Sequence, residues 1–369
     1  MSQVTQAHTS KATQTRILTP VPYQVQQRWA FHPPKAHAHN PGGPALGLGQ
    51  IPVQFECPRQ PNESFLYRAV ALVGAYGIGV GDWAPLLGHR TGATYAAVAT
   101  VPAGGWYRLE VRGTESQARL AASVEPVGVG EVFVIAGQSY AEGCNDELLR
   151  VQDPHARVSA YDVVGHAWRV AHDPQPNLGE GGTIWPPMAD ALLPLARVPI
   201  GFFNVASGGT ASRQWLPGEQ LYQNLARAVK KVGRFRAVLW QQGESDVIEG
   251  VSTQTYVENL VEIRSSLAEE WGFDAPWLLA KSTLHPTVYH DPQGEERIRA
   301  ATDRLWRMPG FRPGPDTDIL DGAHRGGPDS RRHLTGLGQR RAGLMWFVAV
   351  WNELNRCSAE SAKVRPERG

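Results

Sequence analysis

The stretch EVFVIAGQSYAEG, residues 131–143, decides the fold of the longer part of this chain. Its apolar run VFVIA leads directly into the turn Gly137-Gln138-Ser139. A short continuous apolar run is typical of a parallel strand that is buried on both faces. Because sites in open α/β sheets lie beyond the carboxyl ends of the strands, the sequence makes Ser139 a candidate nucleophile.

Short apolar runs of the same kind recur towards the end of the chain. VPIGFFNVA and AVLW are further short apolar runs, and helical patterns lie between them. In TQTYVENLVEIRSSLAEEWG, residues 253–272, apolar side chains recur at helical spacing and Gly272 predicts the end of the helix. Strands that alternate with helices predict an α/β domain over residues 129–355, followed by a polar C-terminal tail at 356–369.

The segment that precedes this region predicts β-structure. In IPVQFEC and GGWYRLEVRG, apolar and polar residues alternate as in half-buried strands. Gly and Pro recur throughout, and no long helical pattern is present. Residues 17–118 are therefore predicted to form a small β-sandwich domain, and the polar residues 1–16 a disordered N-terminal tail.

Composition limits the partners and the compartment. A formal net charge of +1 gives no electrostatic reason to expect nucleic acid or an anionic membrane as a partner. No apolar run approaches the roughly 18 residues that span a bilayer, and nothing in the sequence fixes the oligomeric state. The first residues lack a signal-peptide pattern and the three cysteines are far apart. A cytoplasmic protein is therefore expected, with a secreted or periplasmic one open if a leader has been removed.

Three further polar segments follow the predicted strands or enter the last helix. NVASGGTASRQW contains Gly208 and Gly209, whose backbone N–H groups no side chain would block. WQQGESD offers the amide of Gln242, and HLTGLGQRRAG offers the imidazole of His333. A serine nucleophile needs a base and hydrogen-bond donors for the developing oxyanion, and these residues could supply both to Ser139. No cluster has the spacing of metal ligands, so neither a metal nor a cofactor is expected.

Taken together, IAGQS, ASGGT, WQQGESD and HLTGLG resemble the SGNH-type hydrolases, and more narrowly the sialate O-acetylesterase-like carbohydrate esterases. The resemblance covers most of residues 129–350, and the segment ending in GGWYRLEVR is similar to the β-domain that often precedes that catalytic domain. It implies a flavodoxin-like three-layer α/β/α fold. It also implies a serine esterase that removes O-acetyl groups from sialic acid or other acetylated glycans through an acyl-enzyme.

The resemblance also assigns roles to individual residues. It implies Ser139 as nucleophile, His333 as general base, and a set of oxyanion donors formed by Ser139, Gly208, Gly209 and Gln242. Three residues are expected to support the site rather than to react: Gln138, Glu244 and Asp246. For the two acids, a solvated turn is the alternative. The family usually has Asn where this chain has Tyr140, and three side chains are candidate substrate contacts: Tyr140, Trp215 and His324.

The acid that would orient the histidine is irregular in this sequence. The family expects Asp three residues before the histidine, where this chain has Ser330, and Asp329 lies one residue further away. Asp321 and His324 fit the D-x-x-H pattern literally, but the family-like LTGLG follows His333. We therefore predict His333 as the base with Asp329 as its partner. Asp321, or a dyad in which a backbone carbonyl orients the histidine, stays open.

Two other functions compete with this interpretation. An esterase or lipase of the α/β-hydrolase type would need G-x-S-x-G, but the fifth position here is Ala141. A carbohydrate-binding protein with a catalytically dead esterase fold would explain both the irregular acid and Tyr140.

Overall fold

The computed structural model describes residues 16–29, 46–57, 64–114, 120–286, 289–326 and 332–363. The N-terminal part consists of strands: β1 (Ile17–Thr19), β2 (Val25–Gln27), β3 (Leu48–Glu56), β4 (Phe65–Tyr76), β5 (Gly79–Leu86), β6 (Gly88–Thr91), β7 (Thr94–Pro102), β8 (Gly104–Gly113) and the long β9 (Leu120–Gly137). All but the last residue of the predicted tail 1–16 lie outside the described residues.

Helices and strands then alternate along the chain. They are α1 (Ser139–Glu142), β10 (Val158–Asp162), β11 (Ala167–Val170), α2 (Trp185–Ala196), β12 (Ile200–Asn204), the 3₁₀ turn η1 (Ser212–Trp215), α3 (Gln220–Ala226), α4 (Ala228–Val232), β13 (Ala237–Gln241), α5 (Glu244–Ile248), α6 (Thr253–Trp271), β14 (Trp277–Lys281), α7 (Pro292–Leu305), β15 (Phe311–Asp316), the 3₁₀ turns η2 (Thr317–Ile319) and η3 (Gly322–His324), and α8 (Gly336–Lys363). The last helix continues past residue 355, so the predicted start of a tail at 356 is wrong.

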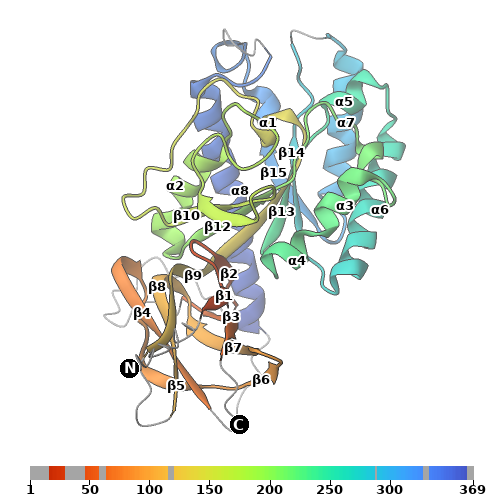
Figure 1. The fold of residues 1–369 in the computed structure, drawn as a ribbon. Helices are drawn as coiled ribbons and strands as arrows, with labels where there is room; N and C mark the ends of the chain where they lie inside the picture. Colours follow the sequence, from red (N-terminus) through yellow and green to blue (C-terminus); the bar gives the residue numbers. More distant parts are fainter. Residues whose placement is uncertain are drawn as a thin grey trace, which may run out of the picture.

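The central sheet has the order β11-β10-β12-β9-β13-β14-β15 (Figure 1). Five neighbouring strands of this sheet are parallel: β12, β9, β13, β14 and β15. When these five are numbered 1 to 5 in chain order, starting with β9, their order in the sheet is 2-1-3-4-5, as in flavodoxin-like sheets. The predicted α/β fold is therefore confirmed. The sequence analysis missed the hairpin β10–β11, whose second strand is antiparallel and makes the sheet mixed.

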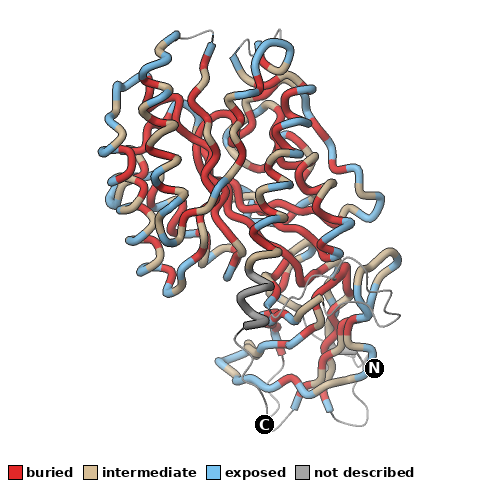
Figure 2. The backbone as a smooth tube through the Cα atoms, turned by 180° about the vertical axis from the view of Figure 1, so that it is seen from behind, coloured by how far each residue is buried: buried red, intermediate tan, exposed pale blue. Residues whose placement is uncertain are grey.

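Helices cover both faces of this sheet because its strands are apolar on both sides. Phe133 and Ile135 of β9 pack in one cluster with residues of α2 and α8, whereas Val132 and Val134 pack in a second cluster with residues of α3, α6 and α7. Neighbouring residues of a strand point to opposite faces, so this alternation produces three layers. Figure 2 shows the buried strands running through the middle of the molecule.

The N-terminal strands form two facing sheets. A four-stranded sheet has the order β1-β3-β7-β6, while β5, β4 and β8 join the first half of β9. Apolar side chains connect the two sheets: the rings of Phe55 and Phe65 lie 4.8 Å apart, and the Tyr67 hydroxyl donates to the Thr100 carbonyl oxygen at 2.8 Å. Because β9 runs unbroken from residue 120 to 137, the predicted change of domain between 118 and 129 falls inside one strand (Figure 1).

A buried ion cluster lies where β9 enters the α/β sheet. The Glu131 carboxylate accepts from Arg28 Nε and from Arg236 Nε, both at 2.7 Å, and the Arg28 and Glu131 side chains are fully buried. Burial alone would raise the pKa of Glu131, but the charges of Arg236 and Arg28 outweigh it and lower this pKa to about 2.

We expect Glu131→Ala to lower the free energy of unfolding by about 3–5 kcal/mol, because Arg28 would remain buried without its counter-charge. Urea unfolding measures this change. The matched control Glu125→Ala removes a half-exposed carboxylate of the same strand that pairs with Arg108, and it should cost about 1 kcal/mol or less. Since the pKa of Glu131 is depressed, its stabilisation is present above about pH 4.5 and is lost as the pH falls towards 2. Equal losses in the two variants would contradict this account.

No helix within the described residues is long and apolar enough to cross a membrane.

Candidate active site

Ser139 lies two residues after the end of the central strand β9, with Gln138 between them. Gly137 ends this strand with φ of 125°, and a Cβ at that position would collide with the backbone of Gln241. Only glycine therefore lets β9 turn so close to β13. Ser139 begins α1 and is 7% exposed. Since β9 has β12 on one side and β13 on the other, the serine lies at the point where the strand order reverses.

Gln138 ties the ends of two strands together. Its side-chain oxygen accepts from the backbone N–H of Ser245 at 3.2 Å and of Gly243 at 3.4 Å. These N–H groups belong to the first turn of α5, where helices leave donors without partners. Gln138 thereby fixes the turn that carries Ser139 against the loop after β13, which is how a supporting residue would act.

A cavity of about 350 Å³ opens above Ser139. Its lining residues come from five separate parts of the chain: Gln138, Ser139, Gly208, Gly209, Ser245, Ile248, Glu249, His285, Arg332 and His333. The structure thus brings the predicted nucleophile, the two glycines and the predicted base to one cavity. Six other predicted site residues that the structure describes do not line it: Gln242, Glu244, Asp246, Tyr140, Trp215 and His324.

The imidazole of His333 has an apolar and cationic environment. Burial lowers the pKa of His333 to about 3, with further contributions from His285, Arg332 and Arg325. The ring is therefore neutral at neutral pH and can accept a proton. Within the described residues the His333 ring has no hydrogen bond to the Ser139 hydroxyl. Hydrogen bonds of this kind often tighten only in the complex with substrate.

The sequence analysis missed His285. This side chain is 6% exposed, lines the cavity, and its Nδ1 has no hydrogen-bond partner among the described residues. Burial lowers its pKa to about 4, helped by Arg332 and Arg325. His285 follows β14, so the rule that singled out Ser139 would also have found it, had WLLAK been treated as a strand.

Tyr140 lies beneath the two histidines rather than on the cavity surface. It is 1% exposed, and its ring meets the His333 ring edge-on with centroids 5.2 Å apart. Its hydroxyl lies 2.8 Å from the Arg332 carbonyl oxygen and also accepts from Arg325. These contacts make Tyr140 a support for the segment that carries His333, and they leave no surface for the expected substrate contact.

The other two expected substrate contacts also lie elsewhere. Trp215 is fully buried, and its indole N–H donates to the Thr210 hydroxyl at 3.1 Å. The Nδ1 atom of His324 lies 2.8 Å from the backbone oxygen of Asp321, so this D-x-x-H pair does not form a carboxylate–histidine contact. Asp329, the predicted acid, lies outside the described residues and stays a prediction.

The amide of Gln242 is already occupied. Its Nε2 donates to the Thr210 carbonyl oxygen at 3.1 Å and to the Asp246 carboxylate, and its Oε1 accepts from the Tyr256 hydroxyl at 3.0 Å. Asp246 also accepts from the backbone N–H of Ser212 at 2.8 Å. Asp246 therefore braces the loop after β12, and Gln242 would have to release these partners before it could donate to an oxyanion.

Glu244 is a buried carboxyl group rather than part of a solvated turn. It is fully buried, and its Oε1 accepts from the Ser282 hydroxyl at 2.7 Å. Burial raises its pKa to about 8, so Glu244 is mainly protonated at neutral pH. It connects the ends of β13 and β14 below the cavity.

An unexpected carboxyl group contacts one of the predicted oxyanion donors. The backbone N–H of Gly208 donates to Glu142 Oε2 at 2.7 Å. Glu142 ends the helical turn that Ser139 begins, is 7% exposed, and has its pKa raised by burial. Gly209 differs, because its backbone N–H has no acceptor in the part of the chain that the structure describes.

The described residues contain no group of three or more His, Cys, Asp or Glu side chains that could hold a metal ion.

Residues 129–305 match the model of the family described as carbohydrate esterase, sialic acid-specific acetylesterase. A curated protein of Arabidopsis thaliana, described as a probable carbohydrate esterase, is 26% identical over 173 residues. That alignment covers 39% of this chain and 65% of the Arabidopsis protein. This chain thus spans slightly less than two thirds of the length of the curated relative.

Among solved structures, a carbohydrate acetylesterase of Xanthomonas citri aligns over 89% of this chain and 73% of its own length, with a TM-score of 0.56 and 19% identity. This similarity concerns the fold, and it extends beyond the α/β region into the N-terminal strands. An Arabidopsis thaliana protein structure aligns over 60% of this chain and 98% of its own length, with a TM-score of 0.49 and 22% identity.

Proposed function

We propose that this chain is a serine esterase that removes O-acetyl groups from acetylated carbohydrates. The match of residues 129–305 to the model of the carbohydrate esterase, sialic acid-specific acetylesterase family supports this proposal. The observation that carries the proposal is the single cavity in which Ser139, Gly209 and His333 meet. A nucleophile, a base and oxyanion donors are the parts that acyl transfer requires. The facing sheets of residues 17–118 would form a β-sandwich domain, with the catalytic domain in residues 129–355.

The proposed reaction has two halves. His333, neutral at neutral pH, takes the proton of the Ser139 hydroxyl as its oxygen attacks the acetyl carbonyl. The backbone N–H groups of Ser139 and Gly209 stabilise the oxyanion. The bond between the acetyl carbon and the sugar oxygen then breaks while His333 gives the proton to that oxygen, which releases the sugar hydroxyl and leaves an acetyl-Ser139 ester. Water activated by His333 attacks this ester, releases acetate and restores Ser139.

His285 and Arg332 are proposed to bind the sugar beside the ester. His285 lines the cavity, and its buried Nδ1 has no hydrogen-bond partner among the described residues. A buried polar group gains most when a ligand supplies its missing hydrogen bond. Because burial keeps His285 neutral, it can form this bond with a sugar hydroxyl without carrying a charge.

Release of acetate from acetylated saccharides tests the proposed function. The purified protein should release acetate from at least one acetylated sugar or glycan and should prefer acetyl over butyryl esters of the same alcohol. Equal or faster release of butyrate would favour the lipase-like alternative. No acetate release from any acetyl ester would contradict the proposal.

The contact between Glu142 and the backbone N–H of Gly208 favours the alternative of a catalytically dead esterase fold. A variant that removes the charge of Glu142 tests whether this contact suppresses activity. Glu142 occupies the N–H of Gly208 and would repel a developing oxyanion when ionised. We expect Glu142→Gln to raise kcat by about threefold to tenfold, because it removes this charge but keeps a side-chain oxygen for Gly208. Steady-state kinetics with an aryl acetate measure the effect. A fall in kcat would instead mean that the carboxyl group positions Gly208 for catalysis.

A further inference from the structure

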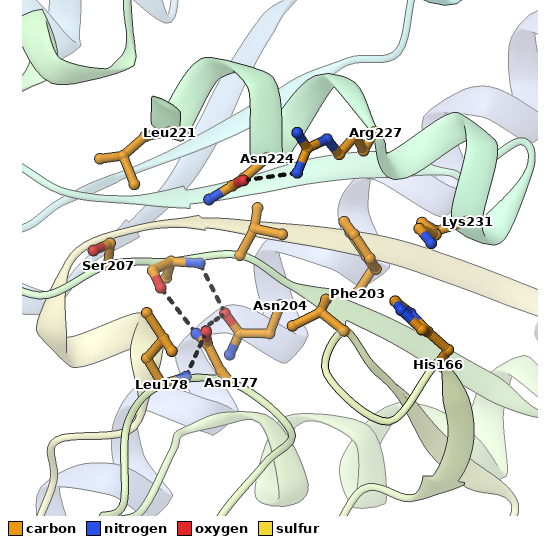
Figure 3. Close-up of a pocket in the computed structure, with 13 residues that line it drawn as sticks. His166, Asn177, Leu178, Phe203, Asn204, Ser207, Leu221, Asn224, Arg227 and Lys231 are labelled. Atoms are coloured by element: carbon orange, nitrogen blue, oxygen red, sulfur yellow. Dashed lines mark hydrogen bonds between the residues drawn. The ribbon is translucent and has the colours of Figure 1, made fainter. Parts of the chain in front are cut away.

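A second and larger cavity, of about 460 Å³, lies over β12 on the side of the sheet that α3 and α4 cover (Figure 3). It is lined by Val163, His166, Asn177, Leu178, Phe203, Asn204, Val205, Ala206, Ser207, Leu221, Asn224, Arg227 and Lys231. We call it the β12 groove. Ser207 is the neighbour in sequence of Gly208, which lines the catalytic cavity, so the linings of the two cavities include adjacent residues of the chain.

The β12 groove is elongated, and different residues line its two ends. Figure 3 shows Ser207, Leu178 and Leu221 at one end, and His166 and Lys231 at the other. Between the two ends the buried lining side chains are mostly apolar. They are Phe203, Val205 and Ala206, together with the amide of Asn204. The chain from residue 203 to 207 spans about 13 Å if it is extended. A ligand that reaches from the catalytic cavity to Lys231 must therefore be longer than one sugar ring.

The charges in the groove have one sign. Arg227 and Lys231 line it, and no Asp or Glu is among the lining residues. Neither cation forms an ion pair with a residue that the structure describes, although Arg227 donates to the Asn224 side-chain oxygen at 3.5 Å. Lys231 lies in the last turn of α4, where a cation also interacts with helix carbonyl groups. That interaction does not explain why Arg227 and His166 share the same groove.

Hydrogen bonds between side chains and backbone fix the wall of the β12 groove. Asn177 donates through Nδ2 to Asn204 Oδ1 at 3.1 Å and to the Ala206 carbonyl oxygen at 2.9 Å. Asn204 in turn donates to the Ala141 carbonyl oxygen at 3.0 Å, two residues after the nucleophile. These bonds hold the loop around Leu178 against the end of β12 and connect the groove to the helical turn of Ser139.

We propose that the β12 groove binds the part of the saccharide that extends from the acetylated sugar, and that Arg227 and Lys231 select chains with a carboxylate-bearing sugar. This inference rests on the proposed esterase function for the link between the two cavities. An apolar floor with a few placed polar groups is the common form of a ligand site. A guanidinium and an ammonium without ionic partners are suited to a carboxylate.

Titration calorimetry with three unacetylated probes tests the groove independently of catalysis. The probes are a galacturonic acid trimer, sialyllactose and the neutral xylotriose, and the first two distinguish a uronate from a sialate as the source of the carboxylate. We expect Arg227→Gln/Lys231→Gln to weaken the binding of at least one acidic probe by about tenfold to a hundredfold. Its affinity for xylotriose and its kcat/KM on an aryl acetate should equal those of the wild type.

Lys230→Gln is the matched control, because Lys230 is an exposed cation of the same helix that does not line the groove. This variant should bind every probe as the wild type does. The proposal is overturned if neither acidic probe binds the wild type, or if the double variant binds both as tightly. A wild type that binds an acidic probe but hydrolyses no acetyl ester would instead refute the esterase function and leave the groove assignment standing.

Discussion

Ser139→Ala is expected to lower kcat for acetyl-ester hydrolysis by about 10³-fold to 10⁶-fold, the range typical for loss of a nucleophile whose oxyanion donors remain. The substitution removes one oxygen from a side chain that is 7% exposed and makes no hydrogen bond within the described residues. The melting temperature should therefore change little. Acetate release and a thermal unfolding scan on the same preparation measure both quantities.

Ser245→Ala is the matched control for this prediction. Ser245 lines the same cavity and is also 7% exposed, but it follows β13 and has no predicted catalytic role. It should keep kcat within about tenfold of the wild type. If Ser139→Ala retained more than about a tenth of the wild-type rate, Ser139 would not be the nucleophile.

His333→Ala should be about as inactive as Ser139→Ala, because an unactivated serine is a weak nucleophile. The control is His324→Ala, which removes the histidine of the literal D-x-x-H pair. His324 does not line the cavity, so its variant should stay active. An inactive His324→Ala together with an active His333→Ala would reverse the assignment of the base.

The pH dependence of kcat/KM separates two environments for His333. Without a carboxylate partner, burial keeps its pKa near 3, so kcat/KM should stay level from pH 8 to about 5 and fall only below that. If Asp329 does contact the ring, the pKa of His333 rises and the acidic fall begins near pH 6 or above. In that case Asp329→Asn should lower kcat by about 10⁴-fold. A profile that is level to pH 5 with an inactive Asp329→Asn would contradict both alternatives.

The sequence was sufficient to predict those helices and strands whose apolar residues follow a clear pattern. VFVIA, AVLW and the helical stripe after residue 253 became β9, β13 and α6, since burial on two faces or on one stripe leaves a distinct pattern. The family resemblance is confirmed by the match over residues 129–305. Parallel neighbouring strands end at the same edge of a sheet, so the positions of Ser139 and Gly208 after two such strands predicted that they lie close together. Both residues line one cavity in the structure.

Long-range contacts could not be predicted in this way. Nothing in the sequence indicates that Glu142 reaches the N–H of Gly208, or that the Gln242 amide is used by Thr210 and Asp246. Each depends on the packing of loops that are distant in the sequence. Trp215 illustrates the same difficulty, since a tryptophan in a polar segment could lie on the surface or in the core, and here it is fully buried.

The most direct test of the account is the site of covalent modification by an active-site phosphonate. The protein is incubated with a fluorophosphonate, digested, and the modified peptide is identified by tandem mass spectrometry, with Ser139→Ala treated in parallel. The account predicts one adduct on Ser139, abolished in the variant and reduced when an acetylated saccharide is present. A wild type that stays unmodified while it releases acetate, or an adduct on another residue that persists in Ser139→Ala, would contradict it.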